Sequence, residues 1–500
     1  MQTRMMRARR VRFFFGTLAL MLCAALAAGG YAAAAPGAGE VTPSWAVEPI
    51  PCPIEITPTL AGRLACARLR VPENRAVAGG RQIRLVFAVV QPAQPVPNRK
   101  PLLFIMGGNG SGMKTLKRNA RFTEFLSQGH TVIIADHRGS TPWGDPDMSC
   151  PRYEEGLDAV NENADPGEVE ACRKHLEERL DVNAYGPYEA ALDLRDLRRA
   201  LGIEQWNVYG VSYGTTIGER LVAVDGDAIA ALVLDGMSGV DFNSFSEAFL
   251  LDPLIDLFDE CAASAVCSRA FPQFERQLGA VTRQLQRRPQ RVGGQRVSNV
   301  EYLTQIRVAM EDPERRGRIP LAVARSAQGD FSVWQQLVAA DAGGPSRKDP
   351  ALTWPASICR DEYPRRALPE RLRPPRRELP ASIRSGSTLG VAALWDWGRF
   401  CPRLGFRASA DETMAVPVSD VPTLFLSGQL DLTTPPFEVD ASMRRLRNSQ
   451  HVVFPLLGHW VLLRDLECAG AIVGNFFDNP SARVDARCVA AMPTTAWAER

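Results

Sequence analysis

Runs of consecutive apolar residues alternate with helix-like segments along much of the chain. The runs suited to buried strands are 81–90, 101–106, 131–136, 205–209, 229–234, 422–427 and 451–455. The segment 188–201 instead places Ala191, Leu194, Leu197 and Leu201 at helical spacing. Continuous apolar strands that alternate with helices are typical of a parallel sheet covered on both faces. The expected fold class is therefore α/β, with a mostly parallel sheet.

The alternation stops near residue 240 and resumes near residue 416. Between these points the periodicity predicts helices over 245–263, 271–287, 300–311 and 319–340, with Ser298 or Asn299 as the N-cap of the third. The segment 364–380 is dense in proline and arginine, which predicts an exposed irregular loop. We therefore expect a sheet domain, formed by 36–240 and 416–500, that is interrupted by a large helical cap insertion at 241–415.

The first 35 residues have the features of a secretory signal peptide. Five arginines come first, an apolar stretch follows at 13–28, and alanines at 32–35 offer a cleavage site, with cleavage expected after Ala34. An uncleaved membrane anchor is the alternative, although the apolar stretch is short for a span. The sequence therefore predicts an exported protein, periplasmic or extracellular, whose mature chain has no stable membrane span.

The cysteines support the same compartment. The chain has eleven, and ten remain once Cys23 is removed with the signal peptide. An even number of cysteines in an exported chain suggests disulfides. Pairing between sequence neighbours would close local loops and would join Cys52–Cys66, Cys150–Cys172, Cys261–Cys267, Cys359–Cys401 and Cys468–Cys488. The sequence by itself does not fix this connectivity, so the pairing is a prediction.

Charge and residue spacing argue against several kinds of partner. No C-x-x-C pair is present and the five histidines are scattered, so neither a metal site nor a cofactor is expected. The net charge of +2 becomes −3 when the five arginines of residues 1–35 are removed. A nucleic-acid partner therefore has no electrostatic support.

The strongest chemical signal is a serine between two glycines. Gly210, Ser212 and Gly214 form a G-x-S-x-G motif that directly follows the strand predicted at 205–209 and directly precedes a predicted helix. Strand, motif and helix in this order are the context of a nucleophile elbow, in which glycines allow a sharp turn that exposes the serine hydroxyl. The helix N-terminus beside it favours the negative charge that develops during acyl transfer. The motif therefore predicts a serine hydrolase.

A serine nucleophile needs a base, and the base needs an orienting acid. In α/β hydrolases the chain order is serine, acid, histidine, and only His451 and His459 follow Ser212. His451 begins a strand and is expected to be structural. His459 lies in the loop after that strand, where catalytic groups gather in such sheets, and is the expected base. Asp431, in the turn after 422–427, is the expected acid, and Asp235 at the end of 229–234 is its competitor.

The oxyanion hole requires two backbone N–H groups aimed at the developing charge. One is expected from Tyr213, which follows the nucleophile, and the other from Gly107 or Gly108 in the loop after 101–106. A phosphate cradle is the alternative for this glycine-rich loop, but the terminal G-K-S/T is missing.

These features together resemble the secreted tripeptidyl aminopeptidases and the related prolyl aminopeptidases, which are α/β-hydrolase serine exopeptidases. The resemblance runs from about Cys52 to the end and is carried by 107–112, 136–139, 210–215, 232–236, 427–435, 458–459 and the cysteine-bracketed tail 468–488. It implies a triad of Ser212, Asp431 and His459 that releases N-terminal fragments through an acyl-enzyme. Two departures, Asn109 in place of a proline and 140–143 in place of glycine and serine, affect the substrate entrance.

An aminopeptidase must also bind a protonated α-amine, which a carboxylate in the cap would favour. The candidates are Asp361, Glu362, Asp256 and Glu260, and the first two are favoured because Cys359 would anchor them. The leading hypothesis is an exported aminopeptidase acting on peptides. The alternatives are an exported carboxylesterase or lipase-like hydrolase of small esters with the same triad, and a non-catalytic binding protein on this scaffold.

Overall fold

The computed structural model describes residues 47–108, 111–140, 143–144, 148–150, 166–239, 241–339, 352–368, 372–392 and 397–499. The predicted signal segment 1–35 and the departure at Asn109 lie outside these residues, as do positions 141–142 of the second departure. Residues 45–500 form one compact unit.

Within the described residues, a nine-stranded sheet has the order β1-β2-β3-β5-β4-β6-β7-β10-β11. Its strands are β1 (Val47–Ile50), β2 (Leu64–Pro72), β3 (Gln82–Val90), β4 (Leu102–Ile105), β5 (Val132–Ala135), β6 (Trp206–Val211), β7 (Ile229–Asp235), β10 (Thr423–Gly428) and β11 (Ser449–Phe454). From β5 through β11 all neighbours are parallel, whereas β1, β2 and β3 pair antiparallel. All the predicted strands are present, and the mostly parallel α/β sheet is confirmed.

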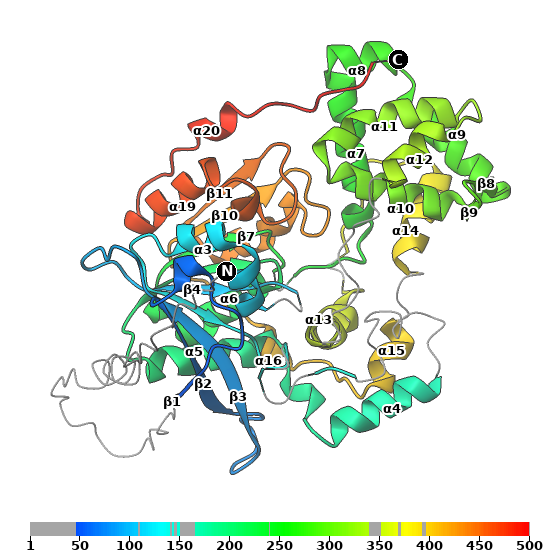
Figure 1. The fold of residues 1–500 in the computed structure, drawn as a ribbon. Coiled ribbons are helices and arrows are strands. Elements are labelled where there is room, and N and C mark those ends of the chain that lie inside the picture. The colour runs from blue at the N-terminus through cyan, green and yellow to red at the C-terminus, as the bar shows by residue number, and fades with distance from the viewer. Residues whose placement is uncertain are drawn as a thin grey trace, which may run out of the picture. The chain divides into compact units, whose positions relative to one another are not determined.

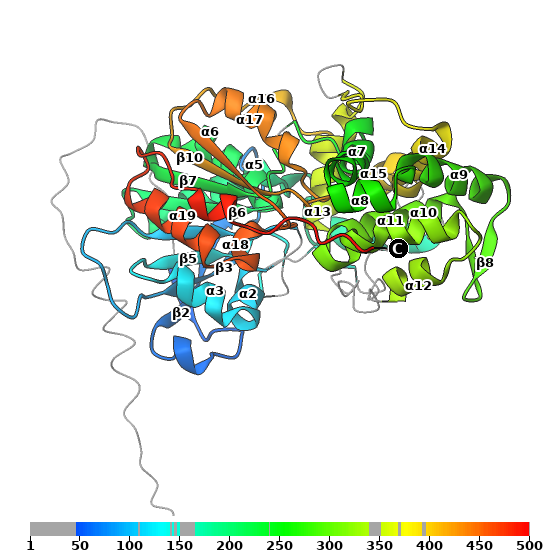
Figure 2. The same cartoon turned by 90° about the horizontal axis from the view of Figure 1, so that it is seen from above.

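Helices cover both faces of this sheet (Figures 1 and 2). Around it lie α2 (Gly112–Arg118), α3 (Ala120–Leu126), α5 (Pro187–Ala200), α6 (Tyr213–Asp225), α17 (Val439–Arg445), α18 (Val461–Arg464), α19 (Cys468–Asp478) and α20 (Arg487–Ala490). Helix α4 (Pro166–Glu177) instead shares a separate apolar cluster with residues 397–404. Apolar side chains of α2, α3 and α19 share one buried cluster with the sheet. Those of α5, α6 and α17 share a second cluster on the other face. The central strands are therefore buried on both sides, which explains their continuous apolar runs.

Helices replace strands between β7 and β10, in the segment that we call the helical insertion (241–415). It contains α7 (Glu247–Ala263), α8 (Ala265–Ala270), α9 (Phe274–Arg287), α10 (Asn299–Met310), α11 (Pro313–Ser326), α12 (Ser332–Ala339), α13 (Thr353–Ser357), α14 (Ala381–Ala392), α15 (Trp397–Arg403) and α16 (Asp411–Met414), with a hairpin of β8 (Gln290–Val292) and β9 (Gln295–Val297). Helices α7, α9, α10 and α11 pack around an apolar cluster that is separate from the sheet clusters. The C-terminal segment reaches these helices (Figure 1), where Ala498 N donates to Gly317 O at 3.0 Å. The division into domains stays a prediction.

One predicted helix in this segment was wrong. The periodicity of 319–340 predicts a single helix, but the structure has α11 and α12 with a turn between them. Gly329 adopts a φ of 87° in this turn, which a continuous α-helix does not allow. Asp330 then accepts a hydrogen bond from Ser332 N at 2.9 Å and starts the second helix. Apolar periodicity continued across the break, so the helical pattern hid it.

Five disulfides in the described residues join the expected neighbours: Cys52–Cys66, Cys150–Cys172, Cys261–Cys267, Cys359–Cys401 and Cys468–Cys488. The bond at Cys359 ties the π-helical turn Ile358–Glu362 to α15. Among the described helices, none is both long and apolar enough to cross a membrane. The same residues contain no group of three His, Cys, Asp or Glu side chains placed to hold a metal ion.

Candidate active site

Ser212 occupies a strained turn between β6 and α6. Its φ of 55° and ψ of −127° lie in a region that residues with a side chain rarely adopt. Such a conformation costs on the order of 1–3 kcal/mol and persists only where the surroundings enforce it. Ser212 N donates to Asp235 O at 2.9 Å, which fixes the turn to the end of the neighbouring strand β7.

The two glycines of the motif are required by close backbone contacts. A Cβ on Gly210 would lie 2.6 Å from Gly214 O, and one on Gly214 would lie 2.3 Å from Ile105 O at the end of β4. Neither backbone can accommodate a side chain at these distances. The glycine spacing therefore allows α6 to start directly above the strands and to hold Ser212 at their carboxyl ends.

Asp431 and His459 form a hydrogen-bonded pair in the loops after β10 and β11. His459 Nδ1 lies 2.8 Å from Asp431 Oδ2, and Asp431 is fully buried. Asp431 Oδ1 accepts hydrogen bonds from Thr433 N at 2.9 Å and Thr434 N at 2.8 Å. Thr434 Oγ1 donates to Oδ2 at 2.7 Å. The carboxylate is therefore held on both oxygens, in an orientation that fixes the imidazole.

The surroundings of His459 favour its protonated form. Burial opposes the charged imidazolium, but the Asp431 carboxylate outweighs it, with help from Asp235 and Glu311, so the pKa of His459 is raised. A base whose pKa is raised toward the working pH accepts a proton readily.

Ser212 and His459 lie at the same edge of the sheet, where the carboxyl ends of the parallel strands β6 and β11 are found. Ser212 is bonded to Asp235, and a Cβ on the next residue, Gly236, would lie 3.1 Å from the His459 ring. Among the described residues the structure has no hydrogen bond between Ser212 Oγ and His459 Nε2. Such bonds are commonly long without substrate and tighten in the complex.

The competing residues have other partners. Asp235 Oδ1 accepts from Val461 N and its Oδ2 from Leu462 N, both at 2.9 Å, so this carboxylate holds the chain just after His459. Burial raises the pKa of Asp235 to about 6. His451 lies in β11, where its Nε2 is 3.0 Å from Ser427 Oγ, in agreement with the structural role expected for it.

The expected oxyanion-hole residues surround Ser212. Tyr213 is the first residue of α6, so its N–H is one of those that helical bonding leaves open. Gly107 packs directly against the nucleophile, since a Cβ there would lie 2.4 Å from Ser212 Cβ. Gly108, with a φ of 56°, lines the same cavity as Ser212. These backbones are therefore close enough to the serine to serve a developing oxyanion.

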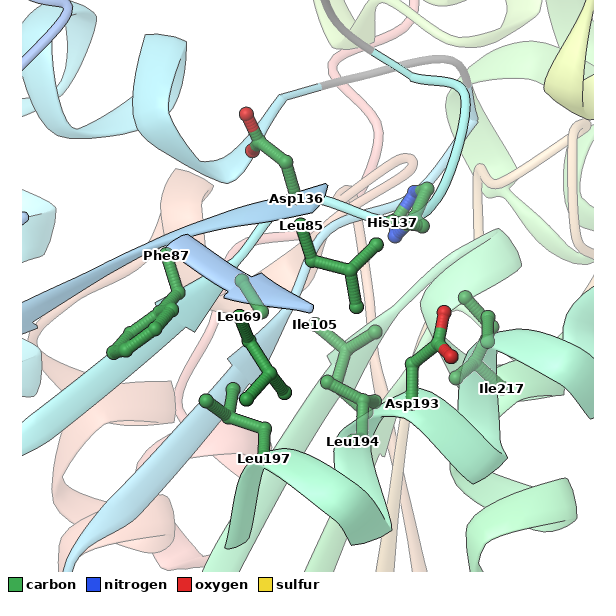
Figure 3. A pocket seen from close by; sticks show the side chains of 12 residues that line it. Leu69, Leu85, Phe87, Ile105, Asp136, His137, Asp193, Leu194, Leu197 and Ile217 are labelled. Carbon is green, nitrogen blue, oxygen red and sulfur yellow. The ribbon is translucent and has the colours of Figure 1, made fainter. Parts of the chain in front are cut away.

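Asp136 and His137, the two residues after β5, contact the oxyanion-hole region, where Asp136 holds the glycine-rich loop between β4 and α2. Figure 3 shows Asp136 and His137 pointing in different directions around a small buried cavity of about 10 Å³, which has no room for a substrate. Asp136 accepts hydrogen bonds from Ser111 Oγ at 2.9 Å and Met113 N at 3.2 Å, at the start of α2. Burial lowers the pKa of His137 to about 4, so it is neutral, and its ring packs on Tyr213 at 5.6 Å.

A larger cavity, of about 380 Å³, opens beside Ser212. Its walls come from the strand-end loops, from α6 and from the helical insertion, and its lining residues include Ser212, Tyr213, Arg220, Phe249, Asp361 and Thr434. A cavity of this size is typical of a small-ligand site. The helical insertion therefore completes the site that the sheet begins.

Two of the four predicted amine-binding carboxylates line this cavity. Asp361 is 7 % exposed, and its buried Oδ1 has no hydrogen-bond partner in the described ranges of the chain. Glu362 Oε1 accepts hydrogen bonds from Ser244 N at 2.7 Å and from Ser244 Oγ at 2.5 Å. An unpaired buried carboxylate oxygen is costly, so Asp361 is suited to receive a cation from a ligand.

The other two carboxylates, Asp256 and Glu260, are not among the residues that line this cavity. Asp256 pairs with Arg376, which belongs to the segment 364–380 that was predicted to be an exposed irregular loop. Glu260 lies 2.9 Å from Arg316 and accepts a further hydrogen bond from Gln429 at 2.8 Å. Both carboxylates therefore already have cationic partners from distant parts of the chain.

The sequence reasoning also missed residues that shape the site. Thr434 follows the acid by three positions and bonds to both Asp431 and His459 Nδ1, the latter at 3.1 Å. Arg220 lies eight positions after Ser212 and lines the cavity. Its position on α6 could have been found from helical periodicity, because residues four apart share a face.

Comparison with known proteins identifies the fold family of the chain. Residues 100–466 match a family model described as alpha/beta hydrolase fold. Among solved structures, the chain is similar to a proline iminopeptidase of Mycobacterium smegmatis, with 15% identity, a TM-score of 0.37, and coverage of 83% of this chain and 98% of that one. A thermophilic esterase from Thermogutta terrifontis shows 16% identity, a TM-score of 0.34, and coverage of 83% and 99%. A putative acyltransferase from Salmonella enterica shows 15% identity and a TM-score of 0.34, with coverage of 85% of this chain and 96% of that one. Likenesses this low do not choose between the activities of these proteins.

Proposed function

Because the chain belongs to the α/β-hydrolase fold family, we propose that it is an exported serine aminopeptidase of the tripeptidyl or prolyl type. Ser212 is the nucleophile, His459 the general base, and Asp431 the acid that orients the base. The hydrogen-bonded pair of Asp431 and His459, at the strand end that also holds Ser212, supports these roles. The five disulfides support an oxidising compartment.

The proposed reaction proceeds through an acyl-enzyme. Ser212 Oγ attacks the carbonyl carbon of a peptide bond while His459 Nε2 takes the hydroxyl proton, and Asp431 stabilises the imidazolium. The backbone N–H groups of Tyr213 and of Gly107 or Gly108 stabilise the oxyanion. His459 then gives its proton to the leaving amine, and the shortened peptide departs. Water, deprotonated by His459, attacks the ester and releases the N-terminal fragment and free Ser212.

One observation carries the aminopeptidase proposal: Asp361 lines the cavity that contains Ser212, and its buried Oδ1 has no hydrogen-bond partner among the described residues. A protonated α-amine bound there would gain charge-assisted hydrogen bonds. It would also place the scissile bond a short and fixed distance from the peptide's N-terminus. The enclosure of the cavity by the helical insertion suits a short fragment better than the middle of a long chain.

A second candidate function is the hydrolysis of small esters. Phe242, Phe249, Ile358 and Met414 also line the cavity and offer an apolar surface to an acyl chain. This activity would use the same triad and would not need a cation to bind Asp361.

Turnover of matched reporter substrates separates the two candidates. The wild-type protein is given a tripeptide reporter with a free amine, the same reporter with an acetylated amine, a prolyl reporter and a short acyl ester. We expect the free-amine peptide to be cleaved at least tenfold faster than the acetylated one. Equal rates on both peptides, with faster ester turnover, would favour the esterase. Turnover retained in Ser212→Ala would remove the serine mechanism from both candidates.

A further inference from the structure

The helix that begins at Ser212 also brings a cation to the cavity. Tyr213, Thr216 and Arg220 follow one another at turn spacing along α6, and all three line the cavity. Arg220 is fully buried, and its Nε and Nη1 have no hydrogen-bond partner among the residues that the structure describes. Its Nη2 donates to Met414 Sδ at 3.1 Å, and a thioether sulfur is a weak acceptor. The guanidinium is therefore enclosed, with donors left open.

A buried charge of this kind must be compensated, because arginine does not lose its proton in proteins. Burial lowers the pKa of Arg220, whereas the charges of Asp361 and Glu219 favour its charged form. No ion pair within 4.0 Å joins Arg220 to a carboxylate among the described residues, so the compensation acts at longer range. Asp361 Oδ1 is unpaired as well, and both groups line one cavity.

The distance from the nucleophile suits a group near the peptide's N-terminus. Eight residues of α-helix separate Ser212 from Arg220 and span about 12 Å. Helical side chains tilt back toward the helix N-terminus, which brings the guanidinium closer to Ser212. An extended peptide advances about 3.4 Å per residue. The open donors therefore lie about one to three residues from the bond that is cleaved.

We propose that Arg220 binds the side-chain carboxylate of an acidic residue in the N-terminal fragment, so that this site selects fragments containing Asp or Glu. The inference rests on the proposed function, in which Asp361 binds the α-amine. An amine alone would make Arg220 and the ammonium share the charge of Asp361. An acidic side chain supplies the missing negative charge and bonds to the open guanidinium N–H groups, which match a carboxylate in geometry. A glutamine of equal size supplies no charge.

Peptide binding can be measured in the Ser212→Ala protein, which lacks the proposed nucleophile and therefore should not cleave the peptide. Isothermal titration would compare amidated tetrapeptides with a free amine that carry Glu at the first, second or third position with the same peptides carrying Gln there. At one of these positions we expect the Glu peptide to bind at least tenfold more tightly. Equal binding of Glu and Gln at all three positions, or no measurable binding of either, would overturn the inference.

Variants of Arg220 then test whether this residue causes the preference for Glu over Gln peptides. In the Ser212→Ala background, Arg220→Met should bring the Glu and Gln affinities within about threefold of each other, and Arg220→Lys should keep part of the difference. Arg287→Met, on an exposed position of α9, is the matched control and should keep the full preference. A preference that survives Arg220→Met in a protein with a normal melting curve would overturn the assignment. If Arg220→Met does not fold, the lysine variant decides, because an unchanged Glu-to-Gln ratio there contradicts bidentate binding.

The same experiment separates this inference from the proposed function. If the wild-type protein does not cleave peptides but Ser212→Ala binds Glu peptides preferentially, the aminopeptidase activity fails and the Arg220 site stands. If peptides are cleaved at equal rates with Glu or Gln, the proposed function stands and the Arg220 inference fails.

Discussion

Two regions border the cavity and treat their charged groups in opposite ways. At the carboxyl ends of the strands, both oxygens of Asp431 accept hydrogen bonds, and the loop after β10 also holds His459 through Asp431. Where α6 and the helical insertion line the cavity, Asp361 and Arg220 keep buried polar atoms that have no hydrogen-bond partner within the described part of the chain. Groups that must hold one geometry during chemistry are saturated before substrate arrives. Groups that bind a substrate's own charges must stay open until the substrate supplies the partner.

The largest effect is expected at the strand ends, where the charged groups already have all their hydrogen-bond partners. Asp431→Asn keeps the side-chain volume but removes the charge and the acceptor that orient His459, so kcat should fall about 10⁴-fold. Steady-state kinetics on the free-amine tripeptide reporter would measure this. Asp235→Asn, which alters the competing carboxylate behind His459, serves as the comparison. If Asp235→Asn cost more than Asp431→Asn, the assignment of the acid would be reversed.

The second effect concerns the disulfide that anchors Asp361. Its cysteines are 42 residues apart, so replacing Cys359 and Cys401 with serine should lower the free energy of unfolding by about 4 kcal/mol. The loosened turn should also reduce the preference for a free amine, while Ser212 keeps its reactivity toward a fluorophosphonate.

Urea unfolding and the peptide reporters test this, and the second disulfide pair provides the control. Cys468 and Cys488 are 20 residues apart, and their replacement with serine should cost about 3 kcal/mol without changing the amine preference. An equal loss of preference in both double variants would show that the effect is general destabilisation.

A third change tests the cavity wall formed by α6 and the helical insertion, where Asp361 lies. Asp361→Asn removes the charge proposed to bind the α-amine, so kcat/KM for free-amine peptides should fall about 10- to 100-fold, the range of a charge-assisted hydrogen bond. Hydrolysis of the acetylated peptide should change little. Asp256→Asn removes a carboxylate that pairs with Arg376 outside the cavity and should leave both rates intact. The same loss in both variants would contradict the role of Asp361.

The smallest change per step of the experiment is a pH dependence of stability from Glu438, in the 3₁₀ turn Pro436–Glu438, which is gradual and spread over several pH units. Burial raises the pKa of this carboxyl to about 8, and the nearby Glu362 and Asp241 add to the shift while Arg373 opposes it. The folded state therefore holds a proton that the unfolded chain releases near pH 4.5. The free energy of unfolding should fall as pH rises between these values, by at most about 1.4 kcal/mol per pH unit.

Urea unfolding at pH 5, 6.5 and 8 would measure this slope. Glu438→Gln should flatten it, whereas Glu314→Gln, at an exposed position of α11, should not. A slope that is the same in both variants would place the linked proton on another group.

Much of the strand-end region followed from local sequence. The apolar runs predicted the strands that β4, β6, β7, β10 and β11 now form, and the loops after them carry the candidate triad. Chain order then selected Asp431 and His459, because parallel strands bring their carboxyl ends to one edge. Gly210 was informative for a local reason, since a Cβ there would meet Gly214 O within the motif, whereas the contact that excludes a Cβ at Gly214 comes from Ile105 O on the neighbouring strand β4.

The other wall of the cavity depends on contacts between distant segments. The sequence favoured Asp361 and Glu362 only for their closeness to Cys359. The structure separates the candidates by their partners, because Arg376 and Arg316 pair with Asp256 and Glu260, whereas Asp361 Oδ1 has no hydrogen-bond partner within the described part of the chain. The break at Gly329 was hidden for a related reason, since apolar spacing continues on both sides of it.

The sequence by itself therefore determined the fold class, the serine turn and the order of the candidate catalytic groups, because each depends on local periodicity or on the direction of parallel strands. Only the tertiary structure decided which charges are neutralised and which stay open. Burial and pairing depend on segments that are far apart in the chain, and for that reason the cavity's unpaired Asp361 and Arg220 became visible only when α6 and the helical insertion were brought together.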